Sequence, residues 1–273
     1  MGNEAEYLLG ASDAERARLI AQCEIHRAEA AWLLDRIGVN SGWHALDVGC
    51  GPLGVLDLLH ERVGPGGEVV GLDREARMLE MARRSIAERD LRTVRLVEAE
   101  AQASGLPAAS FDLAHARLVL VNVSYPPQVV AEMVRLVRPG GWVALQEVDW
   151  ISWTCEPPHP AWDQLIAVLT SAWREAGLDV FIGRRLAGML SAAGLVDVQA
   201  KPHAYLWRPG DLYQTLLITF VGIARERILA AGALAEADLD RILAELSAHL
   251  AHPGTSVVYA LFFQAWGRKP VET

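Results

Sequence analysis

A glycine-rich turn between an apolar strand and a helix is the feature that most constrains how this chain can fold. Residues 45–54 read ALDVGCGPLG, in which the apolar run ends at Val48 and glycines follow at Gly49 and Gly51. Pro52 suits the first position of a helix, because its missing N–H would be unpaired there in any case. Glycines lack a Cβ and let a ligand approach the backbone closely, so the pattern predicts a ligand-binding strand–turn–helix unit.

The acid inside this strand, Asp47, restricts the ligand that the turn can accept. The spacing Gly49-x-Gly51-x-x-Gly54 also fits dinucleotide-binding folds, which place a pyrophosphate against the helix N-terminus. A carboxylate directly beneath that position would repel the phosphates. S-adenosylmethionine carries an ammonium and a sulfonium and no phosphate, so the charge of Asp47 favours it over NAD as the cofactor.

A second apolar strand, residues 68–73, also ends in an acid. Asp73 lies roughly 20 residues beyond the turn, where nucleotide-binding folds place a ribose-binding acid. The ribose is common to NAD and S-adenosylmethionine, so Asp73 does not separate them. The competing interpretation is a helix N-cap, because a helix is expected from Arg74 onward. The position after the glycine turn favours the ribose interpretation.

Apolar strands alternate with amphipathic helices, which predicts an α/β fold with a doubly wound, mostly parallel sheet covered on both faces. The expected strands are residues 43–48, 68–73, 93–98, 111–117, 142–149, 196–207 and 257–266. The expected helices are residues 13–37, 52–62, 75–89, 127–137, 160–176, 183–194, 210–231 and 236–250.

Composition narrows the possible partners. The formal net charge of −9 would repel a phosphate backbone and argues against nucleic acid as the substrate. Cys23, Cys50 and Cys155 are far apart and odd in number, which predicts reduced thiols in a cytoplasmic protein rather than disulfides or a metal site. The first residues resemble no signal peptide, and no apolar run has the length of a membrane span. We therefore expect a small-molecule substrate and no metal, nucleic acid or membrane partner, and the sequence leaves monomer or homo-oligomer undecided.

Several segments, taken as an ordered set, resemble the class I S-adenosylmethionine-dependent methyltransferases, in particular the small-molecule branch of the ubiquinone and menaquinone methyltransferases. The segments that carry the resemblance are 47–51, 71–73, 78–79, 98–102, 106–107, 111–112 and 136–142. The resemblance covers residues 40–150 well and the rest in outline. It implies a Rossmann-like, seven-stranded sheet whose last strand is antiparallel and lies between strands five and six.

Relative to that minimal fold, the chain has two insertions, which we expect to be helical and to pack with the N-terminal helix as a cap. The expected order is an N-terminal helical lid, a cofactor-binding core, a helical cap insertion, a core helix with strand six, a second helical cap insertion and the last core strand. These parts correspond to residues 1–40, 41–150, 151–178, 179–208, 209–253 and 254–273.

The resemblance places the cofactor at the carboxyl ends of the strands, where the strand order reverses. It implies that Gly49 and Gly51 expose backbone to the methionine part, that Asp47 lies near the ammonium, partly through water, and that Asp73 holds the ribose. The expected cofactor-binding residues are Asp47, Gly49, Cys50, Gly51, Asp73, Arg74, Met78, Glu100, Ala101, Gln102, Ala116 and Arg117.

The adenine and the carboxylate of the cofactor have their own candidates in this set. Arg74 and Met78 would flank the adenine, and Glu100, where the family more often has Asp, would accept a hydrogen bond from the adenine amino group. The backbone N–H of Ala101 would donate to the ring. Arg117 would pair with the cofactor carboxylate or, alternatively, with an acid of the protein itself.

The implied reaction is a direct displacement at the sulfonium methyl by a C, N or O atom of a small, largely apolar or aromatic metabolite. Alignment and desolvation supply roughly 7–11 kcal/mol in such reactions, whereas a hydroxyl acceptor would also need a general base. Glu147 and Asp149 are the candidate bases because they share one face of strand five, or the pair could bind a cationic substrate. More distant candidates are His26, His115, His159 and His203.

Aromatic residues indicate where the acceptor binds. Trp150 and Trp153 follow strand five closely and suit flat, apolar or cationic ligands, although both could simply pack the cap. Tyr7, Gln22 and His26 in the N-terminal segment are expected to contact the substrate as a lid.

Two other functions stay open at this point. One is an NAD(P)-dependent oxidoreductase with a Rossmann domain, against which the charge of Asp47 argues. The other is a non-catalytic protein that keeps the cofactor fold, against which the intact Asp47, Gly49, Gly51 and Asp73 argue.

Overall fold

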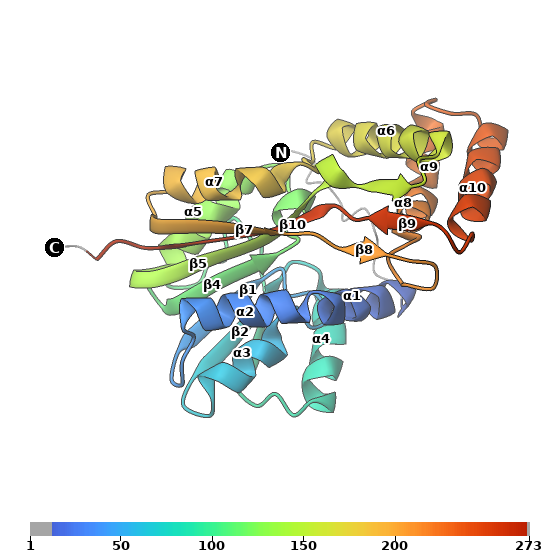
Figure 1. Cartoon of the computed structure of the whole chain (residues 1–273). Coiled ribbons are helices and arrows are strands. Elements are labelled where there is room, and N and C mark those ends of the chain that lie inside the picture. Colours follow the sequence, from blue (N-terminus) through green and yellow to red (C-terminus); the bar gives the residue numbers. More distant parts are fainter. Residues whose placement is uncertain (1–12, 272–273) are drawn as a thin grey trace.

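The computed structural model describes residues 13–271, and a seven-stranded sheet forms its centre (Figure 1). The strands of this sheet are β1 (His44–Val48), β2 (Glu68–Asp73), β3 (Val94–Glu98), β4 (Phe111–Arg117), β5 (Val137–Asp149), β7 (Val196–His203) and β10 (Leu261–Arg268). Their order is β3-β2-β1-β4-β5-β10-β7, and β10 runs antiparallel to both of its neighbours. The Rossmann-like arrangement with an antiparallel last strand is therefore confirmed.

Helices cover both faces of this sheet, as the alternating pattern predicts. They are α1 (Asp13–Ile25), α2 (Arg27–Ile37), α3 (Leu56–Val63), α4 (Ala76–Glu88), α5 (Pro126–Leu136), α6 (Pro160–Glu175), α7 (Leu186–Ala192), α8 (Leu216–Ile223), α9 (Arg225–Ala230) and α10 (Glu236–Leu250). Short 3-10 turns are η1 (Leu120–Asn122), η2 (Trp150–Ser152) and η3 (Ile182–Arg185). In Figure 1, α2 and α3 lie on one side of the sheet and α5 and α7 on the other. Within the described residues, no helix has both the length and the apolar character that a membrane crossing requires.

Successive side chains of β1 point to opposite faces of the sheet and enter two different apolar layers. Ala45 belongs to the same buried cluster as Leu33 of α2 and Leu59 of α3, whereas Leu46 belongs to the other buried cluster, with Met133 of α5. Each fully buried Leu or Met of this kind contributes roughly 1.5–3 kcal/mol relative to an exposed one. The burial of both faces fixes β1, and hence the turn that follows it, at the centre of the fold.

Two of the expected helices in the first 65 residues differ from the structure. The helix expected over 13–37 breaks at His26, whose ring is buried and stacks on Phe262 with 4.1 Å between centroids. The helix expected from Pro52 begins only at Leu56, because glycines with positive φ occupy the turn as far as Gly54. Pro52 is therefore part of the turn and not the first residue of the helix.

A second, three-stranded sheet was not expected from the sequence. It consists of β6 (Thr154–Glu156), β9 (Ser256–Val258) and β8 (Leu206–Trp207), paired antiparallel in the order β6-β9-β8. The strands expected over 196–207 and 257–266 each divide to supply both sheets, and the helix expected over 210–231 divides into α8 and α9. Helices α6, α8, α9 and α10 pack together beside the small sheet (Figure 1).

Candidate functional site

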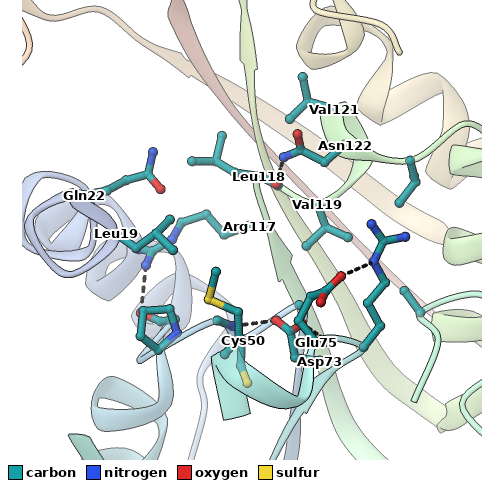
Figure 2. A pocket seen from close by; sticks show the side chains of 18 of the residues that line it. Leu19, Gln22, Cys50, Asp73, Glu75, Arg117, Leu118, Val119, Val121 and Asn122 are labelled. Atoms are coloured by element: carbon teal, nitrogen blue, oxygen red, sulfur yellow. Dashed lines mark hydrogen bonds and ion pairs between the residues drawn. The ribbon is translucent and has the colours of Figure 1, made fainter. Parts of the chain in front are cut away.

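A cavity opens at the carboxyl ends of β1, β2, β4 and β5, where the strand order reverses. Open α/β sheets commonly bind their ligands at this position. Figure 2 shows Leu19 and Gln22 of α1 on one side of it, Val121 and Asn122 of η1 on another, and Asp73 below. Helix α1, the glycine turn and the loop after β4 thus enclose one site.

The glycine turn requires its glycines for steric reasons. Gly49, Gly51 and Gly54 have φ values of 66°, 52° and 52°, in the left-handed region that other residues rarely adopt. A Cβ on Gly49 would lie 2.5 Å from Cγ2 of Val119, and a Cβ on Gly54 would overlap Oδ2 of Asp47. The turn therefore keeps an open backbone facing the cavity.

Asp47 lies beneath the turn and does not line the cavity. Its side chain is 2% exposed, its Oδ2 accepts a hydrogen bond from the Val55 N–H at 3.0 Å, and its Oδ1 lies 2.8 Å from Nδ1 of His115. Both oxygens have partners inside the protein and Asp47 is absent from the cavity wall, so the structure does not favour direct contact of its carboxylate with the cofactor ammonium, and the expected contact through water stays a prediction. Its position supports the turn from below.

Asp73 lies in the cavity wall at the end of β2. Its Oδ2 accepts from the Gly51 N–H at 2.9 Å and its Oδ1 from the Glu75 N–H at 3.0 Å. Burial raises the pKa of this carboxyl, and the two N–H groups oppose the shift. Helix α4 begins at Ala76 with Glu75 at its N-cap, so Asp73 is not the N-cap residue. Each carboxylate oxygen has a further lone pair for a ligand hydroxyl.

Arg117 connects the turn to α1. Its Nη2 donates to the Gly54 carbonyl at 2.7 Å and contacts Sγ of Cys23 at 3.1 Å. The side chain also lines the cavity beside Leu118 (Figure 2). A cation therefore stands next to the glycine turn, at the position expected to face a ligand carboxylate.

Most of the other residues expected to bind the cofactor also meet at this cavity. Those in its wall are Gly49, Cys50, Gly51, Asp73, Arg74, Met78, Glu100, Ala101, Gln102 and Arg117. The N–H of Ala99 donates to the carbonyl of Asp73 at 3.1 Å, which holds the end of β3 beside the end of β2. Ala116 is buried in β4 and does not line the cavity, so its expected contact with the cofactor is wrong.

Neither candidate base on β5 reaches the cavity. Glu147 is fully buried and accepts from the Leu120 N–H at 2.6 Å, and burial raises the pKa of its carboxyl to about 8. Asp149 is fully buried and forms two 2.5 Å hydrogen bonds with the guanidinium of Arg184. The predictions of a general base or of a cationic-substrate site at this pair are wrong, because both side chains point to partners within the protein.

The four candidate histidines also lie outside the cavity wall. His26 is fully buried, and its Nδ1 lies 3.1 Å from the hydroxyl of Tyr205. It therefore joins α1 and α2 to the segment after β7 and does not contact a substrate. The other three candidate histidines, His115, His159 and His203, do not line the cavity either.

An aromatic wall faces the glycine turn across the cavity, and the sequence predicts it only in part. Trp150 and Gln22 line the cavity, whereas Trp153 is buried behind it; Tyr7 lies outside the described residues. Three further aromatic residues of the wall were not predicted from the sequence, namely Trp173, Phe220 and Tyr259. The apolar face of the helix expected over 160–176 was a signal for Trp173, but no pattern placed the other two at the site.

Phe220 is at the centre of this wall. Its ring stacks with those of Trp150 and Trp173, with 6.3 Å between centroids in each pair. The guanidinium carbon of Arg18 lies 5.9 Å from the centroid of the Phe220 ring. The acceptor side of the cavity is thus apolar and aromatic, with one cation above it.

Known proteins resemble this chain in sequence and in fold. A family model described as "Methyltransferase domain" matches residues 46–145. Demethylmenaquinone methyltransferase of Geobacillus sp. (strain WCH70) is 32% identical, over 63% of this chain and 79% of that protein. An uncharacterised 37.1 kDa protein in transposon TN4556 of Streptomyces fradiae is 31% identical over 84% of this chain, and the match spans 65% of that longer protein.

Solved structures show the same fold. The YcgJ protein of Bacillus subtilis has a TM-score of 0.60 at 18% identity, covering 90% of this chain and all (100%) of that one. A protein described as a putative methyltransferase of Bacillus halodurans has a TM-score of 0.58 at 16% identity, covering 88% of this chain and 99% of that one.

The sheet, the glycine turn and the cavity define an enzyme of the S-adenosylmethionine-dependent methyltransferase class. The chain belongs to the class I family of these enzymes and is similar to its demethylmenaquinone methyltransferases. S-adenosylmethionine is therefore its cofactor, and the oxidoreductase alternative finds no support in the comparisons.

Proposed function

We propose that this enzyme methylates a small, flat, largely apolar or aromatic acceptor that binds against the wall formed by Trp150, Trp173, Phe220 and Tyr259. The observation that carries this proposal is the wall itself, whose members come from η2, α6, α8 and the segment between β9 and β10. Aromatic side chains offer large flat surfaces to apolar rings. The names of the demethylmenaquinone methyltransferase relatives support an acceptor of quinone type.

A neutral or anionic acceptor fits this wall better than a cationic one. The guanidinium of Arg18 already lies above the Phe220 ring, so a cation has taken the face that would attract an ammonium group. Arg74 and Arg117 add two further guanidinium groups to the cavity wall. An acceptor amine would have to bind in its uncharged form.

The residues at the opposite end fit S-adenosylmethionine. Asp73 would accept from the ribose hydroxyls, Met78 and Glu100 would contact the adenine, and Arg117 would pair with the carboxylate. When bound, the cofactor supplies an electrophilic sulfonium methyl. The chain itself contributes orientation of the acceptor and exclusion of water, which together supply roughly 7–11 kcal/mol.

The acidic side chains in the described wall, Asp73, Glu75 and Glu100, all belong to the cofactor end. The acceptor therefore has to provide its own nucleophile, such as a carbon activated by a neighbouring oxygen or a phenol acidic enough to ionise. A weakly acidic aliphatic alcohol would react poorly, because it needs a base that removes its proton.

The N-terminal segment acts as the lid of this site, and the segments 151–178 and 209–253 act as its cap. Arg18, Leu19, Gln22 and Cys23 of α1 line the cavity, which supports the lid. Cys23, Cys50 and Cys155 are free, which suits the reducing cytoplasm. Deletion of residues 1–25 should abolish methyl transfer while the sheet stays folded, and full activity after deletion would refute the lid.

The substrate class is tested with radiolabelled S-adenosylmethionine and a panel of acceptors of similar size. We expect turnover with quinols, phenols and related enols and little with alkylamines or simple alcohols. Preferential methylation of alkylammonium compounds would contradict the proposal.

A further inference from the structure

A buried chain of hydrogen-bonded side chains lies below the glycine turn, and the methyl-transfer chemistry described above does not use it. It consists of Asp47 on β1, His115 on β4 and Gln146 on β5, which are 2%, 1% and 0% exposed. Nδ1 of His115 lies 2.8 Å from Oδ1 of Asp47, and its Nε2 lies 2.9 Å from Oε1 of Gln146. Three adjacent strands are thereby joined at the base of the site.

The partners of the His115 ring nitrogens indicate where the ring carries its protons. Both ring nitrogens face oxygens that can only accept a hydrogen bond, one from a carboxylate and one from an amide carbonyl. Two such bonds require an N–H on each nitrogen, which is the imidazolium form. Nε2 of Gln146 has no hydrogen-bond partner within the described residues. A half-turn of that amide would instead suit a neutral imidazole, and this is the alternative that the test must exclude.

The carboxylate of Asp47 needs this support because it has a second contact. Its other oxygen accepts from the Val55 N–H and fills the space beneath Gly54, so no Cβ fits there. The Gly54 carbonyl in turn accepts from Arg117, which lines the cavity. A shift of the Asp47 carboxylate would therefore move both the turn and Arg117.

We propose that His115 and Gln146 are positioning residues of the cofactor site, and that His115 holds Asp47 in a buried, charge-balanced pair that fixes the glycine turn. An isolated buried carboxylate is strongly unfavourable, whereas one paired with a cation and hydrogen-bonded is tolerated. The pair presents no net charge to the cofactor, and Asp47 acts on the ligand through the shape of the turn. The inference rests on the proposed placement of the methionine part of the cofactor at this turn.

The first test measures S-adenosylhomocysteine binding by calorimetry for His115→Leu and His115→Gln, with His44→Gln as the matched control. His44 is exposed at the start of β1, the strand that carries Asp47. We expect His115→Leu to weaken binding roughly 10- to 100-fold, the loss of a charged hydrogen bond, with the control unchanged. His115→Gln should recover part of the affinity, because its amide can donate to Asp47 but carries no charge. The acceptor KM should not move in any variant.

The second test needs no variant and so is independent of any folding defect. In protein labelled with 15N-histidine, the NMR signals of the buried His115 ring should report protons on both nitrogens. A neutral ring, or a folded His115→Leu variant with wild-type affinity, would overturn the proposal. Its failure is separable from that of the proposed cofactor placement: if Asp73→Asn leaves S-adenosylhomocysteine binding intact, the placement is wrong, whatever the state of His115.

Discussion

The cofactor end of the cavity is built mainly from backbone and strand-end residues in three short segments, 49–54, 73–78 and 99–102, whereas the acceptor end combines side chains from α1, η2, α6, α8 and the segment before β10. At the first end the conformation of the chain defines the site. At the second end the shapes of a few large side chains define it. We therefore expect changes at the cofactor end to alter cofactor affinity with every acceptor, and changes at the aromatic wall to alter the choice of acceptor alone.

The largest expected effect concerns η1, the turn that lies between the two ends and is supported by Glu147. Burial raises the pKa of Glu147 from its ordinary value of 4.5 to about 8. The folded protein thus keeps a proton that the unfolded chain releases, so the free energy of unfolding should fall as pH rises from 4.5 to about 8. At about 1.4 kcal/mol for each pH unit, the total fall is at most about 5 kcal/mol.

Urea unfolding across this pH range checks the sign. Glu147→Gln should flatten the decline, because the amide cannot ionise, while Glu156→Gln at an exposed position should retain it. A wild-type stability that rises between pH 5 and 8 in parallel with Glu147→Gln would contradict the assignment.

The next largest effect is expected when a single methyl group is added to the glycine turn at the cofactor end. A Cβ at Gly54 would overlap Oδ2 of Asp47, lie 2.9 Å from the Cys50 carbonyl and force a residue with φ of 52° into a strained conformation. We expect Gly54→Ala to weaken S-adenosylhomocysteine binding by more than about a hundredfold. The steric overlap and the strained backbone together should reduce the binding free energy by about 3 kcal/mol. Gly188→Ala is the control: it lies in α7 with open space around it and should bind normally.

Asp73→Asn should give a smaller loss at the same end. In the wild-type protein the two carboxylate oxygens of Asp73 accept from the N–H groups of Gly51 and Glu75. The amide of the variant keeps only one acceptor oxygen. A charged hydrogen bond contributes about 1.5–3 kcal/mol, so affinity for S-adenosylhomocysteine should fall roughly 10- to 100-fold in calorimetry. An acceptor KM that rises as much as the cofactor Kd would show that the two ends are not separable.

The same contrast explains what the sequence predicts and what it does not. The turn and most cofactor-end residues follow from contiguous motifs, because each strand end carries its own ligand-facing residues, whereas the place of the antiparallel last strand follows from the family resemblance. The alternation along β5 could not show that Glu147 and Asp149 point away from the cavity, since both faces of this sheet are buried. Phe220 and Tyr259 are remote in sequence and meet only when α8 and the segment before β10 pack beside α6.

The smallest expected effect separates the two ends most sharply. Trp173→Leu removes an indole from the acceptor wall and keeps an apolar side chain next to Phe220. Such a change should cost aromatic acceptors about 1–2 kcal/mol, which is roughly tenfold in kcat/KM, while the S-adenosylhomocysteine Kd stays constant. Trp32→Leu, at a half-exposed position away from the cavity, controls for loss of a tryptophan. If Trp173→Leu instead weakened cofactor binding and left the acceptor KM unchanged, the aromatic wall would belong to the cofactor end, and the division of the site into two independent ends would be wrong.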